Sequence, residues 1–171
     1  MRALQIKPFA AVVAIAAVNG PQSVVVSGRK AEVNRVLLDL KGDGIRCVEL
    51  KTSNAFHSPL MDPILKEFGA VASSVTFAKP KIPLVLNRTG AYCDRVLDAA
   101  YWCDHLRNEV RFLDSLKTLE AKGFTIFLEV GPAPTLSGMA RRCIAGKFAP
   151  SMMQVRHGLQ LQSLWKSLLQ L

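Results

Sequence analysis

Aromatic side chains are scarce in this sequence, and long apolar runs are absent. Phenylalanine, tryptophan and tyrosine together make up 7% of the 171 residues. They are not interleaved with glycine and basic residues, the pattern of sheets that stack nucleic-acid bases. No apolar stretch is long enough to span a bilayer as a helix. We therefore expect neither nucleic acid nor a membrane among the partners of this chain.

Cysteine is sparse as well. The cysteines lie far apart and form no Cys-x-x-Cys pair: Cys47, Cys93, Cys103 and Cys143. Two of them lie near His105 in the sequence, but their spacing matches no common zinc pattern. We predict free thiols in a reducing, cytoplasmic compartment, with no disulfide framework and no metal site.

Acidic residues are the scarcer of the two charge types. The chain has 13 acidic and 22 basic residues, a net charge of +9 at neutral pH. Such an excess suits partners that carry phosphate or acidic groups. The basic residues are scattered, with no run longer than Arg141-Arg142. A basic solvated surface is therefore the plainer explanation of the charge.

The N-terminal apolar run permits two interpretations. Arg2 and Lys7 precede the apolar stretch Phe9–Val18, which imitates a short secretory signal with a small-residue cleavage site. That stretch ends in Asn19-Gly20-Pro21, however, and a second apolar run follows at once. A strand, a tight turn and a second strand explain both runs together. A secreted or membrane-associated basic domain remains an alternative.

The first third of the chain predicts two strands, a helix and a third strand. The apolar spacing favours strands Val12–Ala17 and Val24–Ser27 around a turn at Asn19-Gly20, a helix over Lys30–Leu40 closed by Gly42, and a strand over Ile45–Leu50. This order is three quarters of a ferredoxin-like unit.

The remainder alternates helical and strand patterns, which indicates an α/β fold. The expected elements are a helix starting at an Asp62-Pro63 cap, a short strand Ile82–Leu86, a helix from Phe112 to near Lys122-Gly123, a strand Phe124–Val130, a helical face from Leu136 to Ile144, and a final helical stripe Leu161–Leu171. The strand Phe124–Val130 is apolar throughout except for Glu129, as expected for a strand buried on both faces.

One histidine lies where the chain changes direction. His57 falls between the predicted strand Ile45–Leu50 and the helix that starts at Asp62. A side chain at such a corner points out of the packed layers, and imidazole is the usual general base at neutral pH. A turn histidine bonded only to solvent and backbone is the alternative.

Five segments, in sequence order, resemble the acyltransferase domains of modular polyketide synthases. They are Ile15–Gly28, the histidine motif Ala55-Phe56-His57-Ser58-Pro59, the loop Asn87-Arg88-Thr89-Gly90, the stretch Tyr101–Phe112, and Leu128-Glu129-Val130-Gly131-Pro132. The similarity runs from about residue 11 to the C-terminus. On these motifs the chain is identified as similar to the C-terminal part of a malonyl-CoA:acyl-carrier-protein transacylase-like domain of a type I synthase.

The resemblance implies a fold in three parts. Residues 11–56 would form a partial ferredoxin-like small subdomain. Residues 57–148 would form the C-terminal part of the α/β-hydrolase-like large subdomain. Residues 149–171 would form a linker and the start of a helix.

The resemblance also implies a reaction. In this family a serine attacks the thioester of an extender acyl-coenzyme A, and a histidine serves as base before activating the phosphopantetheine thiol of an acyl carrier protein. By resemblance His57 is that base, and the backbone carbonyl of His105 orients its ring. The implied partners are acyl-CoA, acyl carrier protein and neighbouring synthase domains, with no bound cofactor.

The residues before His57 bear on the choice of extender unit. Malonyl-specific members of the family typically carry Ala-Phe here, as Ala55 and Phe56 do, whereas methylmalonyl users carry serine in place of the phenylalanine. Phe56 would fill the space that an α-methyl group needs, a preference of only ~1–3 kcal/mol. The family motif usually begins with histidine, whereas this chain has Asn54. A core-filling role for Phe56 is the alternative.

The family's serine motif Gly-x-Ser-x-Gly does not occur in this chain. Ser137 lacks the flanking glycines of such an elbow, and Ser58 is adjacent to His57, where side chains diverge. The glutamine-glycine region of the oxyanion hole and the arginine that holds the extender carboxylate are missing too. We expect a fragment that supplies His57 to a bipartite site and does not transfer acyl groups alone. A catalytically dead basic module that docks acyl carrier protein is the alternative.

Overall fold

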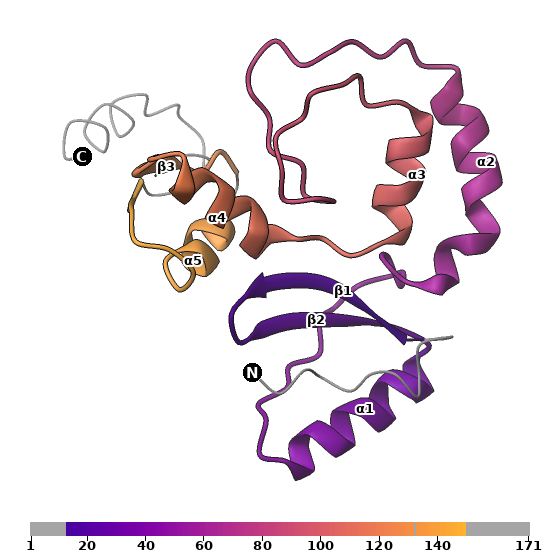
Figure 1. Cartoon of the computed structure of the whole chain (residues 1–171). Coiled ribbons are helices and arrows are strands. Elements are labelled where there is room, and N and C mark those ends of the chain that lie inside the picture. Colours follow the sequence, from indigo (N-terminus) through magenta and orange to yellow (C-terminus); the bar gives the residue numbers. More distant parts are fainter. Residues whose placement is uncertain (1–12, 132, 150–171) are drawn as a thin grey trace, which may run out of the picture.

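A β-hairpin and the helix after it form the first part of the molecule (Figure 1). The computed structural model describes residues 13–131 and 133–149, and strands β1 (Val13–Gly20) and β2 (Ser23–Gly28) pair antiparallel. The predicted hairpin is confirmed, but its turn is at Pro21-Gln22 instead of Asn19-Gly20, because Gly20 still pairs with Ser23. Proline sets the backbone angle that such a turn requires.

Two irregularities in β1 leave backbone carbonyls free to bond with other parts of the chain. The pairing register shifts between Ile15 and Ala17 and again between Val18 and Gly20, so Ala16 and Asn19 have no partner on β2. A bulged residue turns its backbone groups away from the ladder. The carbonyl of Ala16 accepts from the amide of Val110 at 2.8 Å, and that of Asn19 accepts from the Cys143 thiol at 3.2 Å.

Helix α1 (Lys30–Gly42) confirms the helical spacing predicted for this segment. Gly42 lies inside the helix, and the left-handed residue that ends it is Gly44, with φ 75°. The strand predicted over Ile45–Leu50 is wrong: this segment pairs with no strand of the described residues. The apolar side chains of Ile45, Val48 and Leu50 are exposed.

The second part of the molecule mixes helices with short strands. Its elements are the 3-10 helix η2 (Pro59–Met61), α2 (Asp62–Ser73), α3 (Ala99–Arg107), α4 (Phe112–Ala121), β3 (Ile126–Leu128), α5 (Thr135–Ala140) and β4 (Lys147–Ala149). Strands β3 and β4 pair in parallel. In Figure 1 the hairpin lies between α1 and the region of α4 and α5, and α3 runs beside α2. The predicted α/β character is confirmed.

Several predicted elements differ in detail from those observed. Helix α2 begins at Asp62, so Met61 and not Asp62 is its N-cap, because the η2 turn runs directly into it. Within residues 13–131 and 133–149, the segment Ile82–Leu86 makes a single bridge, between Val85 and Tyr92. Helix α3 was not predicted as a helix. The stripe Leu161–Leu171 lies outside the described residues.

Strand β3 is not buried on both faces. Phe124, Ile126, Leu128 and Val130 are all exposed in the described part of the chain. Phe127 points the opposite way and stacks on Phe148, with ring centroids 5.1 Å apart. These rings join a buried cluster that includes Leu116, Ala140 and Ile144.

Glu129 closes the turn between β3 and α5. Its carboxylate accepts hydrogen bonds from the backbone amides of Leu136 at 2.9 Å and Ser137 at 2.7 Å. Burial acts to raise the pKa of Glu129, but these amide donors outweigh it and lower the pKa below its ordinary value. The acid predicted to interrupt an apolar strand therefore caps the next helix.

The loop Asn87–Gly90 is held tightly against helix α4. The carbonyl of Asn87 accepts from the amide of Arg111 at 2.6 Å, and the hydroxyl of Thr118 donates to the carbonyl of Gly90. Gly90 has φ 71°, and a Cβ built on it would lie 2.5 Å from the Cβ of Asp114. Only glycine satisfies both the backbone angle and this close approach.

Substituting Gly90 by alanine tests this fit. We expect Gly90→Ala to lower the free energy of unfolding by about 2–4 kcal/mol, since it adds a clash to the cost of a left-handed alanine. Gly44→Ala is the matched control, with φ 75° and open space around its Cβ, and should cost only about 1 kcal/mol. Urea denaturation measures both, and equal losses would contradict the packing role of Gly90.

Candidate active site

The backbone of His57 is held in an uncommon conformation. His57 has φ 60°, the left-handed region that few residues other than glycine enter. Its amide donates to the carbonyl of Leu106, just before the end of α3, at 3.1 Å. The corner predicted from the sequence is therefore confirmed as a turn, tied to a segment about fifty residues away.

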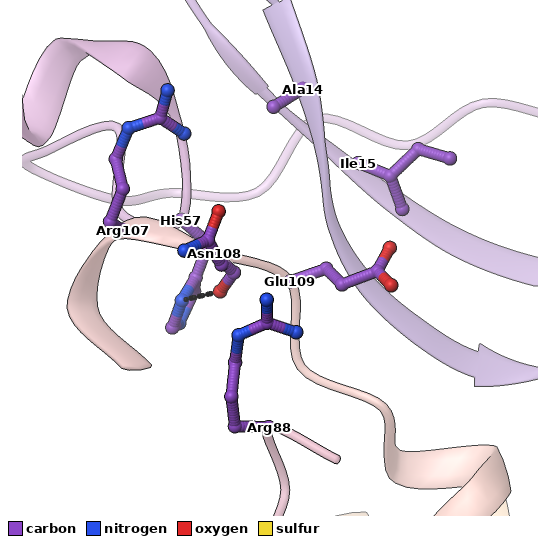
Figure 2. A pocket seen from close by; sticks show the side chains of 7 residues that line it. All are labelled: Ala14, Ile15, His57, Arg88, Arg107, Asn108 and Glu109. Atoms are coloured by element: carbon purple, nitrogen blue, oxygen red, sulfur yellow. Dashed lines mark hydrogen bonds between the residues drawn. The ribbon is translucent and has the colours of Figure 1, made fainter. Parts of the chain in front are cut away.

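The ring of His57 is anchored at one nitrogen. Its Nδ1 lies 2.8 Å from the backbone carbonyl oxygen of Asn108, the dashed contact in Figure 2. A carbonyl can only accept, so Nδ1 must carry the hydrogen of this bond. In the neutral ring Nε2 then has a free lone pair. This is the tautomer that a general base acting through Nε2 requires.

His57 lines an open hollow of about 340 Å³ between β1 and the loops of the second part. The other lining residues are Ala14, Ile15, Arg88, Arg107, Asn108 and Glu109 (Figure 2). Two guanidinium groups and one carboxylate are among them. The hollow is therefore polar and positively biased on its loop side, with apolar side chains on its β1 side.

The carbonyl that orients His57 belongs to Asn108, so the prediction that it is that of His105 is wrong. His105 lies inside α3, where its carbonyl points along the helix axis. Asn108 is the C-cap, with extended backbone angles that turn its carbonyl toward His57. The ring of His105 instead lies nearly perpendicular to that of His57, with centroids 5.7 Å apart. Burial first, and then the neighbouring His57, lowers the pKa of His105.

The anchoring segment is itself fixed by polar contacts. The Asn108 amide donates to a carboxylate oxygen of Asp104 at 2.6 Å. Arg107 donates through Nε to Asp62 in the first turn of α2. Arg107 in the last turn of α3 and Asp62 in the first turn of α2 each carry the charge that the dipole of its own helix favours.

The same segment also joins the hairpin to the second part. Val110 forms a parallel bridge with Ala17 of β1 and exchanges backbone hydrogen bonds with Ala16 and Val18, each 2.8 Å long. Within residues 106–110, Leu106 and Asn108 therefore bond to His57, and Val110 bonds to β1. The position of His57 relative to the hairpin depends on this short piece of backbone.

Ser58 is committed to structure. It is 0% exposed, and its hydroxyl donates to the carbonyl of Ala55 at 2.6 Å while accepting from the amide of Leu60 at 3.3 Å. An oxygen with both functions occupied inside a turn cannot meet a substrate carbonyl. The sequence interpretation likewise gave Ser58 no nucleophilic role.

The two residues predicted to contact substrate do not line the hollow. Phe56 is 44% exposed, which excludes the alternative that it fills the core of the described chain. Ala55 contributes its carbonyl to the Ser58 bond. Sequence reasoning missed Asn108, Arg88 and Glu109 as lining residues. Arg88 and Asn108 fall within or beside the quoted motifs, but nothing in their spacing indicated a shared cavity.

The described residues hold no cluster of three or more histidine, cysteine or acidic side chains suited to a metal ion. The cysteines are free thiols. No helix in the described part of the chain is both long and apolar enough to cross a membrane.

Comparison with known proteins places this chain in a family. Residues 3–154 match the acyl transferase domain family, so the chain belongs to it. It is 44% identical over 148 residues to the polyketide synthase GfsA of Streptomyces halstedii, covering 85% of this chain and 2% of that protein. The predicted resemblance to an acyltransferase domain of a type I polyketide synthase is confirmed.

Solved structures agree with this assignment. The acyltransferase domain from the second module of the salinomycin polyketide synthase is 36% identical, with a TM-score of 0.87, over 96% of this chain and 39% of that one. The acyltransferase domain of SpnD, solved in complex with 2-(pent-4-yn-1-yl)malonyl, is 28% identical, with a TM-score of 0.80, over 92% of this chain and 40% of that one. The chain thus spans well under half of these domains.

Removing the Ser58 hydroxyl tests its structural role. We expect Ser58→Ala to lower the free energy of unfolding by about 1–3 kcal/mol, because a buried backbone carbonyl and amide lose their partner. Ser73→Ala is the control, since its hydroxyl bonds only the Gly69 carbonyl on an exposed helix surface, and should change stability by less than about 0.5 kcal/mol. A Ser58→Ala protein as stable as the control in urea denaturation would contradict the assignment.

Proposed function

We propose that this chain supplies the histidine part of an acyltransferase site that moves an extender acyl unit from coenzyme A to an acyl carrier protein. The observation that carries the proposal is the bond from His57 Nδ1 to the Asn108 carbonyl, which leaves Nε2 as the basic nitrogen. A positioned base of this kind activates hydroxyl and thiol nucleophiles. Family membership makes acyl transfer the reaction to expect of it.

The proposed reaction has two half-steps. In the first, a serine hydroxyl gives its proton to Nε2 of His57 while its oxygen attacks the thioester carbonyl. The carbon–sulfur bond breaks, and the leaving coenzyme A sulfur takes that proton. In the second, the pantetheine thiol of the carrier protein gives its proton to Nε2 and attacks the acyl-serine ester, and the serine oxygen leaves with the proton.

The serine comes, in this proposal, from another segment of the acyltransferase fold. The printed sequence has no Gly-x-Ser-x-Gly run, and Ser58 is buried with its hydroxyl bonded at both functions. The chain covers 39% of the salinomycin domain, so a larger part of that fold lies outside it. The active site is therefore complete only when that part is present.

We also propose the division into residues 11–56 as small subdomain, 57–148 as part of the large subdomain and 149–171 as linker. The hairpin and α1 fall in the first unit, and α2 to α5 with the β3–β4 pair in the second. His57 stands at the first boundary, and its hollow is lined from both sides of it. A site between two units can close on substrate without distorting either.

Malonyl is the extender unit that the chain favours, in this proposal. Ala55 and Phe56 precede the base, and the exposed ring of Phe56 is free to contact a substrate or the missing part of the fold. The related SpnD domain was solved with an α-substituted malonyl group, so a preference for unsubstituted malonyl has to come from the residues of this chain. Phe56 would then discriminate against an α-methyl group by steric exclusion.

Reconstitution tests this function. The chain is expressed together with a polypeptide carrying the serine-motif part of a related acyltransferase domain, and mass spectrometry measures malonyl transfer from malonyl-CoA to a carrier protein. We expect His57→Ala to reduce the transfer rate by about 10²–10⁴-fold. His57→Gln keeps a side chain that can donate to the Asn108 carbonyl but cannot act as a base, and should lose as much.

The same experiment separates the alternatives. Undiminished transfer by either His57 variant would remove His57 from the mechanism. Carrier-protein binding by the chain, with no transfer in any reconstituted mixture, would instead favour the non-catalytic docking module.

A further inference from the structure

Like Arg107 and Glu109, Arg88 is a charged residue of the hollow that the proposed mechanism does not use. Its side chain enters the hollow from the loop Asn87–Gly90 and ends close to Asn108 and Glu109 in Figure 2. It is 26% exposed, so most of a permanently charged group is removed from water. A guanidinium in such a place requires either a compensating charge or a ligand.

The compensation of Arg88 within the chain is incomplete. Its Nε lies 2.8 Å from an oxygen of Asp104, near enough for an ion pair. The N–H of this Nε does not point at the Asp104 oxygen well enough to form a hydrogen bond. This buried Nε therefore has no hydrogen-bond partner among the described residues. Asp104 also accepts from Asn108 at 2.6 Å, so its charge is shared.

The geometry directs the outer edge of the guanidinium into the hollow. Asp104 is met through Nε, the inner nitrogen, and the two outer nitrogens point toward the middle of the lining in Figure 2. Arg107, the other lining arginine, points away in the same view and donates to Asp62. Glu109, the acidic lining residue, turns its carboxylate toward Ile15.

The loop that carries Arg88 is rigid enough to position it. The backbone amides of Thr89 and Gly90 both donate to the carbonyl of Leu86, at 3.2 and 2.7 Å, and Leu86 is buried. The packing of Gly90 against Asp114 fixes the other end of the loop. A charged group on such a support loses little freedom when it binds a ligand.

We propose that Arg88 binds an oxyanion group of the ligand in the hollow beside His57. The outer edge of a guanidinium donates two parallel hydrogen bonds that match the two oxygens of a carboxylate or a phosphate. In an acyl-coenzyme A substrate that group is the free carboxylate of a dicarboxylic acyl unit or a phosphate of the coenzyme. The inference rests on the proposed function for the identity of the substrate, but not for the anion site itself.

The test uses the 171-residue chain and small anions. The chain has three histidines, so the Cε1–Hε1 signal of His57 can be assigned in a carbon–proton correlation spectrum. Titration with malonate, with inorganic phosphate and with acetate at constant pH and ionic strength gives a dissociation constant for each. We expect malonate, phosphate or both to move the His57 signal saturably, and acetate to bind more weakly.

Variants assign the binding to Arg88. Arg88→Gln should weaken the anion that binds by about 10-fold or more, since a charge-assisted, two-point contact is lost. Arg35→Gln removes the same charge from the exposed surface of α1, and should leave the constant unchanged. Arg88→Lys keeps the charge but not the two parallel donors of the guanidinium, so its dissociation constant should lie between those of the other two variants. If Arg88→Gln does not fold, Arg88→Lys serves as the test.

Each outcome bears on the proposal. An effect on malonate alone identifies a carboxylate ligand, and an effect on phosphate alone identifies the coenzyme phosphates. Failure of every anion to bind, or binding that Arg88→Gln and Arg88→Lys leave unchanged, would overturn the proposal. Because no acyl transfer is measured, such a failure is distinct from a failure of His57 variants to stop transfer.

Discussion

The bond between His57 Nδ1 and the Asn108 carbonyl is the constraint on which the site depends. It turns the imidazole toward the hollow and determines which nitrogen carries the proton. His57 makes this bond from an uncommon left-handed backbone conformation, which lowers the stability of the fold by about 1–3 kcal/mol. The second bond, from the His57 amide to the Leu106 carbonyl, offsets part of that cost.

The short segment 106–110 transmits this constraint to the rest of the fold. The Asp62–Arg107 ion pair connects it to α2, and its pairing with β1 connects it to the hairpin. The bulge at Ala16 is what frees a β1 carbonyl for that pairing. An irregularity in one strand and the end of one helix therefore place His57 between the two parts of the molecule.

The sequence predicted correctly those elements that have a clear apolar pattern of their own. Helices α1 and α4 were predicted from apolar residues at helical spacing, which lie on the more buried face of each helix. The hairpin was predicted from its two apolar runs. The strand over Ile45–Leu50 failed, since a strand needs a neighbour that spacing does not reveal. The turn at His57 was predictable from the residues around it. The contact with the Asn108 carbonyl was not predictable, because every residue has a backbone carbonyl and the residue type does not show which one bonds to the ring. The position at which α3 ends decides which carbonyl turns toward His57.

The protonation state of the His57 ring tests the central claim most directly. Long-range nitrogen–proton correlation spectra of the nitrogen-15-labelled chain distinguish the two neutral imidazole tautomers at a pH where the ring is uncharged. We predict that the proton of the His57 ring resides on Nδ1, with Nε2 bare, because the carbonyl of Asn108 can only accept. A ring protonated at Nε2, or an equal mixture of the two forms, would contradict the account.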